Sequence, residues 1–286
     1  MIINDTKKMS RLKIIFIGTP EFGAIILDKL IENGYKPVLV ITAPDKPVGR
    51  KQTITPSPVK ITAQKHKIKV GDRISNISEP VDLIIVAAYG KILPKNILEI
   101  PKYGCLNVHP SLLPKYRGPS PIQMAILNGD KETGVTIMKM DEKIDHGQII
   151  SNSKFLISNK FTYKELHDEL AKLGAKLLSK TIPDWINGKI KPVPQDETKA
   201  TYTKIIKKED GMVGWKSPID YIERQVRALN PWPGTYTLYN GKILKILKAE
   251  AAKGELIIKE VQLEGKKPMS FDAFQRGHQD FLGQLE

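Results

Sequence analysis

Short apolar runs that alternate with helical patterns are the feature that most restricts the fold of this chain. The run at 13–17, KIIFI, precedes a helical pattern from Phe22 to Asn33, and a second apolar run, PVLVIT, follows at 37–42. Further strand-like runs occur at 81–87 and 104–109. Because helices that connect consecutive buried strands make those strands parallel, the pattern predicts an α/β domain with a Rossmann-like, doubly wound, mostly parallel sheet.

A change in composition near residue 187 divides the chain. The stretch 187–207 combines glycine, two prolines and polar residues without a helical period, which is typical of a linker. We therefore expect a flexible leader over 1–10, a first domain over 11–186 and a second domain over 208–286. Within the leader, Met9 could be the true start.

The second domain has a different pattern. A helix is expected at about 218–229, and the residues after it form short alternating strands. Asn240-Gly241 is a strong signal for a two-residue hairpin turn. We expect a small β-barrel of the oligonucleotide-binding (OB) type.

The charge of the chain indicates an anionic partner. The formal net charge is +14, and residues 1–70 hold 13 basic against 5 acidic residues, whereas residues 206–286 hold 13 against 11. A polyanion would therefore be held mainly by the first segment. The single cysteine excludes an intramolecular disulfide, and no apolar run approaches the roughly 20 residues of a membrane span. We expect a cytoplasmic monomer without membrane contact.

Two polar residues stand at the end of an apolar strand. In CLNVHPSLLPKYRG, Asn107 and His109 are two positions apart, so their side chains point to the same side of the strand. They lie at the carboxyl end of a parallel strand, where open α/β sheets build their sites. An amide donor beside a titratable imidazole suits a developing oxyanion. The alternative is a buried Asn–His hydrogen bond without chemistry.

The residues near this position also suggest two other kinds of chemistry. Cys105 points to the same side of the strand as His109, but the four-residue step between them along the strand spans about 13 Å. We therefore expect Cys105 to be a small apolar filler and not a nucleophile paired with His109. A metal held by His109, His146 and an aspartate lacks any recognised ligand spacing, and we expect no metal. The polar loop MDEKIDHG, 140–147, could instead supply a carboxylate that orients His109.

The stretch GTPEFG, 18–23, follows the first strand, where dinucleotide-binding proteins place a phosphate loop. Pro20 stands where the middle glycine of that motif belongs, and the lysine of a P-loop is missing. We expect a tight strand-to-helix turn without a nucleotide. The proline-rich excursion 44–60, with Lys46, Arg50 and Lys51, is either a solvated loop or a basic arm for nucleic acid.

Taken together, several motifs resemble the methionyl-tRNA formyltransferases, within the family of 10-formyltetrahydrofolate-dependent formyltransferases. The resemblance runs from about residue 11 to near the C-terminus. It rests on FIGTPEFG, PDKPVGR, PSPVK, AYGKILP, NVHPSLLPKYRG, TGVTIMKMD, IDHG and NPWPGTY.

The resemblance implies formyl transfer from 10-formyltetrahydrofolate to the α-amino group of methionine on initiator tRNA, for translation initiation. It places the catalytic residues at Asn107, His109 and Asp145, and the second domain along the tRNA backbone. The implied folate-binding residues are Tyr89, Gly90, Ile92, Leu93, Ser111, Leu112, Leu113 and Pro114. The implied tRNA contacts are Lys46, Arg50 and Lys51.

The sequence departs from the family pattern at three places. Pro119-Ser120 follows Arg117-Gly118, His146 replaces the usual threonine, and Lys51 follows Arg50. None of these removes a catalytic residue, and we expect His146 to face solvent rather than to shift the pH profile. A formyltransferase acting on a nucleotide-linked amino sugar and a non-catalytic tRNA-binding protein remain as alternatives.

Overall fold

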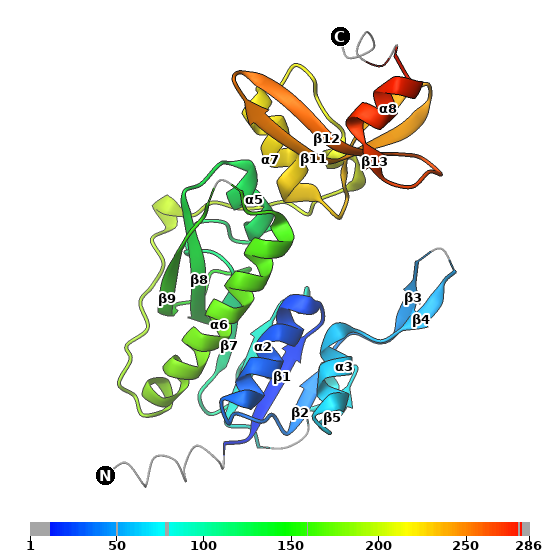
Figure 1. The fold of residues 1–286 in the computed structure, drawn as a ribbon. Coiled ribbons are helices and arrows are strands. Elements are labelled where there is room, and N and C mark those ends of the chain that lie inside the picture. Colours follow the sequence, from blue (N-terminus) through cyan, green and yellow to red (C-terminus); the bar gives the residue numbers. More distant parts are fainter. Residues whose placement is uncertain (1–11, 50, 78–79, 159, 280, 282–286) are drawn as a thin grey trace. The chain divides into compact units, whose positions relative to one another are not determined.

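The computed structural model describes residues 12–49, 51–77, 80–158, 160–279 and 281 (Figure 1). These residues form two compact units. The first comprises the described residues up to Pro119, together with Thr133–Phe155 and His167–Tyr202. The second comprises Ser120–Glu132, Leu156–Leu166 and the described residues from Thr203 onward. The domain boundaries expected at 187 and 208 stay predictions.

A seven-stranded sheet in the order β5-β2-β1-β6-β7-β8-β9 forms the centre of the first unit. The first five strands in this order pair in parallel, and β7 pairs with β8 antiparallel. Every residue of β1, β6 and β7 is buried, as expected for strands covered on both faces. The predicted fold class is confirmed. The strands are β1 (Ile14–Gly18), β2 (Leu39–Ile41), β5 (Lys69–Gly71), β6 (Leu83–Ala87), β7 (Cys105–His109), β8 (Glu132–Lys139) and β9 (Ile149–Leu156).

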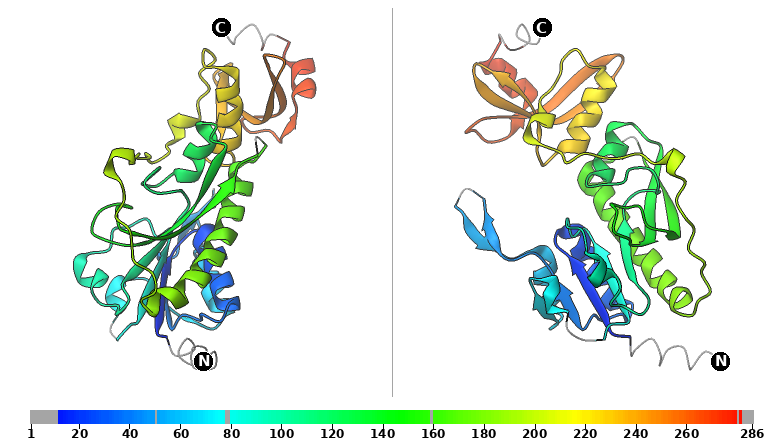
Figure 2. Two further views of the ribbon diagram at one scale, coloured as in Figure 1. Left: turned by 90° about the vertical axis from the view of Figure 1, so that its left-hand side faces the viewer. Right: turned by 180° about the vertical axis from the view of Figure 1, so that it is seen from behind.

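Helices cover the sheet on both faces. On one face lie α2 (Glu21–Glu32) and the long α6 (Tyr163–Ile186), as Figures 1 and 2 show. At Gly174 of α6 a Cβ would lie 2.8 Å from the Val108 side chain, so this glycine allows the helix to approach β7 closely. On the other face, Ile97 of α4 (Lys95–Leu98) packs in a cluster with Cys105 and other strand residues.

The GTPEFG stretch forms the tight turn from β1 to α2. Gly18 ends the strand, and Pro20 precedes the first helical residue. A Cβ on Gly18 or Gly23 would lie 2.6 or 2.8 Å from the carbonyl oxygen of Ala87 at the end of β6. Both glycines are therefore required by close packing, Gly18 at the end of β1 and Gly23 in the first turn of α2, against the end of β6.

The basic excursion contains a hairpin that the sequence did not indicate. Strand β3 (Lys46–Val48) pairs antiparallel with β4 (Thr53–Thr55), and the hairpin projects from the sheet in Figures 1 and 2. The next helix, α3 (Pro58–Lys65), begins after Ser57, whose Oγ accepts a hydrogen bond from the Lys60 amide at 3.0 Å.

The second unit contains an antiparallel sheet in the order β10-β11-β12-β13. Asn240 and Gly241, both with positive φ, form the expected turn between β10 and β11. Buried apolar residues of the sheet, α7 and α8 form its core. The elements are α5 (Pro121–Leu127), α7 (Ile219–Leu229), β10 (Thr235–Tyr239), β11 (Lys242–Ala252), β12 (Glu255–Leu263), β13 (Met269–Ser270) and α8 (Phe271–Gly277). Short 3-10 helices lie at Ile74–Asn76, Glu197–Lys199 and Lys208–Gly211. Within the described ranges, no helix is long and apolar enough to cross a membrane.

Candidate active site

Strand β7 carries Asn107 and His109 on one side. Both are nearly buried, with exposed fractions of 8% and 4%. The strand lies between β6, which is parallel to it, and β8, which is antiparallel. Because the side chains of a strand alternate, this central position fixes the direction of both polar groups at the carboxyl end of the strand.

The third residue, Asp145, joins them from the loop between β8 and β9. Asn107 Nδ2 donates to Asp145 Oδ1 at 3.2 Å, and His109 Nδ1 lies 3.5 Å from the same oxygen. The other carboxylate oxygen, Oδ2, accepts from the Gly118 amide at 2.8 Å. The structure therefore brings the three residues expected to be catalytic into one cluster.

The imidazole of His109 is oriented by a backbone carbonyl. Its Nε2 lies 2.9 Å from the carbonyl oxygen of Tyr116, and since a carbonyl only accepts, Nε2 carries a hydrogen. Nδ1 then faces Asp145 at 3.5 Å, which is longer than a good N–H···O hydrogen bond. A proton on Nδ1 can therefore be attracted by Asp145 and still be donated to an oxygen placed beside it.

The backbone of the 140–147 loop is held closely against the sheet. The Met140 amide donates to the Cys105 carbonyl oxygen at 2.8 Å, and Asp145 itself adopts a left-handed conformation with φ 46°. At Gly147 a Cβ would lie 1.8 Å from the Lys139 carbonyl oxygen, so no other residue fits there without displacement of the loop. The glycine of IDHG is thus required by the path of the chain, and aspartate is among the residues that tolerate the left-handed conformation at position 145.

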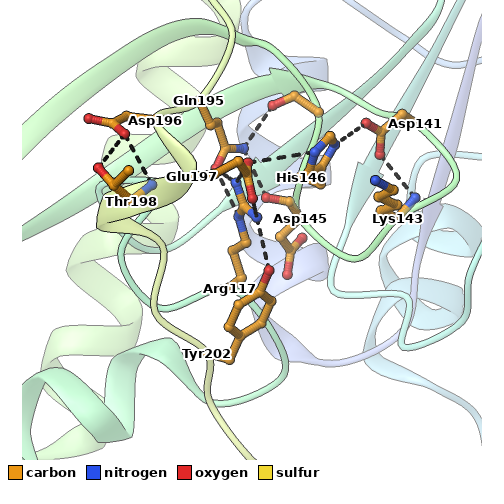
Figure 3. Close-up of polar contacts among 11 residues, drawn as sticks. Arg117, Asp141, Lys143, Asp145, His146, Gln195, Asp196, Glu197, Thr198 and Tyr202 are labelled. Carbon is orange, nitrogen blue, oxygen red and sulfur yellow. Dashed lines mark hydrogen bonds and ion pairs between the residues drawn. The ribbon is translucent and has the colours of Figure 1, made fainter.

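Sequence reasoning missed a polar network around Arg117. The Arg117 side chain is fully buried and contacts Gln195, Glu197 and Tyr202 (Figure 3). Arg117 belongs to a motif that the sequence shows, but nothing in the sequence links it to residues 187–207, whose composition is typical of a linker. His146, which is expected to face solvent, is partly exposed, with 32% of its side chain accessible, and its nitrogens also lie 2.5 Å from Asp141 and 3.6 Å from Glu197.

The residues expected to bind folate fall into two groups. Leu93, Ser111 and Leu113 are buried, and the Ser111 hydroxyl donates to the Lys115 carbonyl oxygen at 2.6 Å, so these three support the loops from inside. The others are partly or fully exposed. They are Tyr89, Gly90, Ile92, Leu112 and Pro114.

A cavity of about 690 Å³ also borders the 140–147 loop. Its lining includes Met140 and Asp141 as well as Lys95 of α4 and Trp185 of α6. None of the three clustered residues and none of the eight expected folate contacts lines it. The cavity is thus a neighbour of the cluster and not its substrate pocket in this conformation.

Two of the residues expected to contact tRNA lie on the β3–β4 hairpin. Lys46 and Lys51 are exposed. Arg50 lies outside the described residues. Val48 and Ile54 of the same hairpin are also exposed, at 48% and 63%, so this hairpin presents apolar as well as basic side chains.

Cys105 is a buried filler, as expected. It is 1% exposed, and burial raises the pKa of its thiol to about 12, which excludes a thiolate nucleophile at neutral pH. Among the residues that the structure describes, no group of three or more histidine, cysteine, aspartate or glutamate side chains could hold a metal ion.

Comparisons with known proteins agree with this geometry. Residues 12–182 match the family described as formyl transferase, and residues 205–256 match the C-terminal domain of formyl transferases. The chain therefore belongs to the formyl transferase family, which confirms the resemblance seen in its motifs.

Within that family, several similar curated proteins are methionyl-tRNA formyltransferases. The one from Bacillus velezensis is 45% identical over 299 aligned residues, covering 93% of this chain and 94% of its own. The one from Halalkalibacterium halodurans is 47% identical over 248 aligned residues, covering 84% and 78%.

Solved structures share the fold at lower identity. A methionyl-tRNA formyltransferase from Clostridium thermocellum matches with a TM-score of 0.60 at 21% identity, covering 88% of this chain and 98% of its own. An N-formyltransferase from Helicobacter canadensis, in complex with folinic acid and dTDP-3-aminofucose, matches with a TM-score of 0.68 at 22% identity, covering 91% and 98%.

Proposed function

We propose that this protein transfers the formyl group of 10-formyltetrahydrofolate to the α-amino group of methionine on initiator tRNA. The proposal is supported by curated relatives of that name at 45% and 47% identity. The observation that carries it is the cluster in which Asp145 contacts both Asn107 and His109. An amide donor, an imidazole and a carboxylate are the groups that acyl transfer to an amine requires.

The reaction forms a bond between the amine nitrogen and the formyl carbon, breaks the bond from that carbon to N10 of the folate, and moves a proton from the amine to N10 overall. Negative charge develops on the formyl oxygen. The Asn107 amide and a proton on His109 Nδ1 are the donors that would stabilise this oxygen. The loss of one such donor costs about 2.7–4 kcal/mol of transition-state stabilisation.

Asp145 has two roles in this proposal. Its Oδ1 faces the imidazole, so its negative charge stabilises a positively charged His109. Its partly exposed carboxylate also accepts the proton that the amine loses, directly or through a water molecule. The hydrogen bond from the Gly118 amide to Oδ2 holds the carboxylate in this orientation.

The folate contacts are proposed from the exposed group described above. Ile92 and Leu112 offer apolar surface for the flat pterin and benzoate rings, and the backbone near Gly90 offers polar groups. The buried residues Leu93, Ser111 and Leu113 would act indirectly, because they support the loops that carry these contacts.

The tRNA contacts are proposed at the hairpin. Lys46, Lys51 and the intervening Arg50 would contact the acceptor end through phosphates, and the second domain would lie along the tRNA backbone. The variant Lys46→Ala/Lys51→Ala should raise KM for tRNA and make it less dependent on salt, with kcat retained. Lys189→Ala, an exposed lysine in an ion pair with Asp184, is the control.

An assay with purified protein, methionine-charged initiator tRNA and 10-formyltetrahydrofolate tests the function. We expect formyl-methionyl-tRNA as the product and no formylation of a nucleotide-linked amino sugar. Asp145→Asn should lower turnover by about 10²- to 10⁴-fold. If the folded protein yields no formyl-methionyl product, the proposal is wrong, and formylation of the amino sugar alone would support the alternative enzyme class.

A cytoplasmic location and a monomeric state complete the proposal. The proposed substrates, charged initiator tRNA and folate, occur in the cytoplasm, and the single cysteine is compatible with a reducing compartment. Sedimentation of the purified protein tests the monomeric state.

A further inference from the structure

We propose that Arg117 and Gln195 are positioning residues that hold the backbone of Asp145 in place for formyl transfer. The inference rests on the role proposed above for Asp145. It assigns a function to the segment 193–202, which the sequence indicated only as part of a linker.

Arg117 is a charged side chain with no exposed surface. Its guanidinium donates to both carboxylate oxygens of Glu197, at 2.9 and 2.6 Å, and to the Tyr202 hydroxyl at 3.0 Å. Its Nε and Nη2 donate to Gln195 Oε1 at 3.0 and 2.8 Å. Burial of a guanidinium is costly unless it is paired in this way, and such networks serve specificity better than stability.

The charge of Arg117 determines how the Gln195 amide is oriented. A guanidinium only donates, so the amide oxygen of Gln195 must face it and the amide nitrogen must point the other way. That nitrogen donates to the carbonyl oxygens of Asp145, at 2.9 Å, and Gly147, at 2.8 Å. Gln195 therefore holds the backbone on both sides of His146 (Figure 3).

These backbone contacts matter because Asp145 has an unusual conformation. Its φ of 46° is uncommon for a residue other than glycine and persists only where the surroundings fix it. The direction of the Asp145 side chain toward Asn107 and His109 follows from that backbone conformation. A displacement of about 1 Å at such a group can lower a rate about 100-fold.

The same segment also supports the other side of the cluster. The Tyr116 amide donates to Thr201 Oγ1, and the Arg117 amide donates to the Thr201 carbonyl oxygen, both at 2.8 Å. Tyr116 is the residue whose carbonyl oxygen orients His109. One segment thus fixes the backbone behind both Asp145 and the acceptor for His109.

Two variants of Gln195 test the proposal. Gln195→Met removes the hydrogen bonds of the side chain and nearly preserves its volume. Gln195→Glu keeps an acceptor for Arg117 but removes both donors to the loop. We expect kcat to fall about 10- to 100-fold in each, with KM for folate and tRNA within about twofold of wild type. Gln195→Glu should remain folded because Arg117 keeps an acceptor at position 195 as well as its ion pair with Glu197.

The matched control is Gln225→Met. In the second unit, Gln225 Nε2 likewise donates to two backbone carbonyl oxygens, those of Asp210 and Met212, at 2.9 and 3.1 Å. Its loss should lower the thermal midpoint without a change in kcat. If the Gln195 variants lose activity only in proportion to their unfolded fraction, as a purely structural role requires, the proposal is overturned.

A second readout does not depend on activity. The Gly118 amide donates to Asp145 Oδ2, so its hydrogen exchange reports the position of that carboxylate. Peptides that contain Gly118 should exchange faster in both Gln195 variants than in wild type and the control. Unchanged exchange together with wild-type kcat would overturn the inference. Inactivity of the wild-type protein would instead overturn the proposed function, with the exchange result still deciding the positioning role.

Discussion

Asp145 Oδ1 lies 3.5 Å from His109 Nδ1, and no other ring atom of His109 is left for a substrate, because Nε2 is directed at the Tyr116 carbonyl oxygen. The proton that the imidazole donates in the proposed reaction is therefore the one shared with the aspartate. This relationship makes the two residues a single functional unit, whose variants should not behave additively.

Asn107 should contribute to catalysis more independently than His109, which acts together with Asp145. Asn107→Ala is expected to lower kcat about 100-fold or more, with tRNA affinity unchanged, because an amide that stabilises the oxyanion is lost. Steady-state and single-turnover kinetics measure this. Asn33→Ala, at the exposed end of α2, is the control and should retain wild-type rates. Near-normal turnover of the Asn107 variant would make that residue structural.

Gly147→Ala should disturb the Asp145 loop. The new Cβ would lie 1.8 Å from the Lys139 carbonyl oxygen, so the backbone must move. We expect a loss of about 1–3 kcal/mol in the free energy of unfolding and a fall in kcat. Denaturant titration and kinetics test both effects. Gly277→Ala in α8, where the Cβ meets nothing within 4 Å and alanine favours the helix, should keep kcat and should not lower the free energy of unfolding, and equal stability of the two variants would refute the close packing.

Cys105 should be chemically inert in the folded protein. Burial raises the pKa of its thiol to about 12, whereas an exposed thiol titrates near about 8.5. A thiol reagent at pH 8 should label the native chain far more slowly than the chain in denaturant, where one thiol reacts. Equal labelling rates in the two states would show that the N-terminal end of β7 opens readily.

Glu197 should make stability depend on acid. The Arg117 guanidinium holds the pKa of this carboxyl below its ordinary value of 4.5. A lowered folded-state pKa stabilises the protein above the unfolded-state value, and this contribution is lost as the pH falls through the folded-state value. The thermal midpoint of the wild-type protein should therefore be higher than that of Glu197→Gln at pH 7. The difference between the two midpoints should shrink below about pH 4. A difference independent of pH would argue against the ion pair.

The parts of the fold and site that follow from local pattern could be predicted. Runs of consecutive β-branched residues predict the buried strands. That Asn107 and His109 point to the same side of their strand follows from the two-residue period of a strand alone. The choice of Asp145 depended on the resemblance to a family. The residues alone indicated only that some carboxylate of the 140–147 loop could orient His109. The β3–β4 hairpin was not predicted. Lys46–Val48 contains a proline, and because all three residues are exposed, the strand lacks the alternation of apolar and polar residues that indicates a strand.

Long-range polar pairing lay beyond the reach of the sequence. The contact between Arg117 and Gln195 joins residues 78 positions apart and depends on the burial of a charge that composition gives no reason to expect. His146 shows the same difficulty, because its partner Glu197 lies in a segment that looked like solvated chain.

The pairing of Arg117 also limits where this protein can be divided. A fragment that stopped at Ile186, the end of α6, would keep every residue of the Asn107–His109–Asp145 cluster and lose Gln195, Glu197 and Tyr202. The Arg117 guanidinium would then lose each of these three partners, so a minimal catalytic fragment must extend at least through Tyr202.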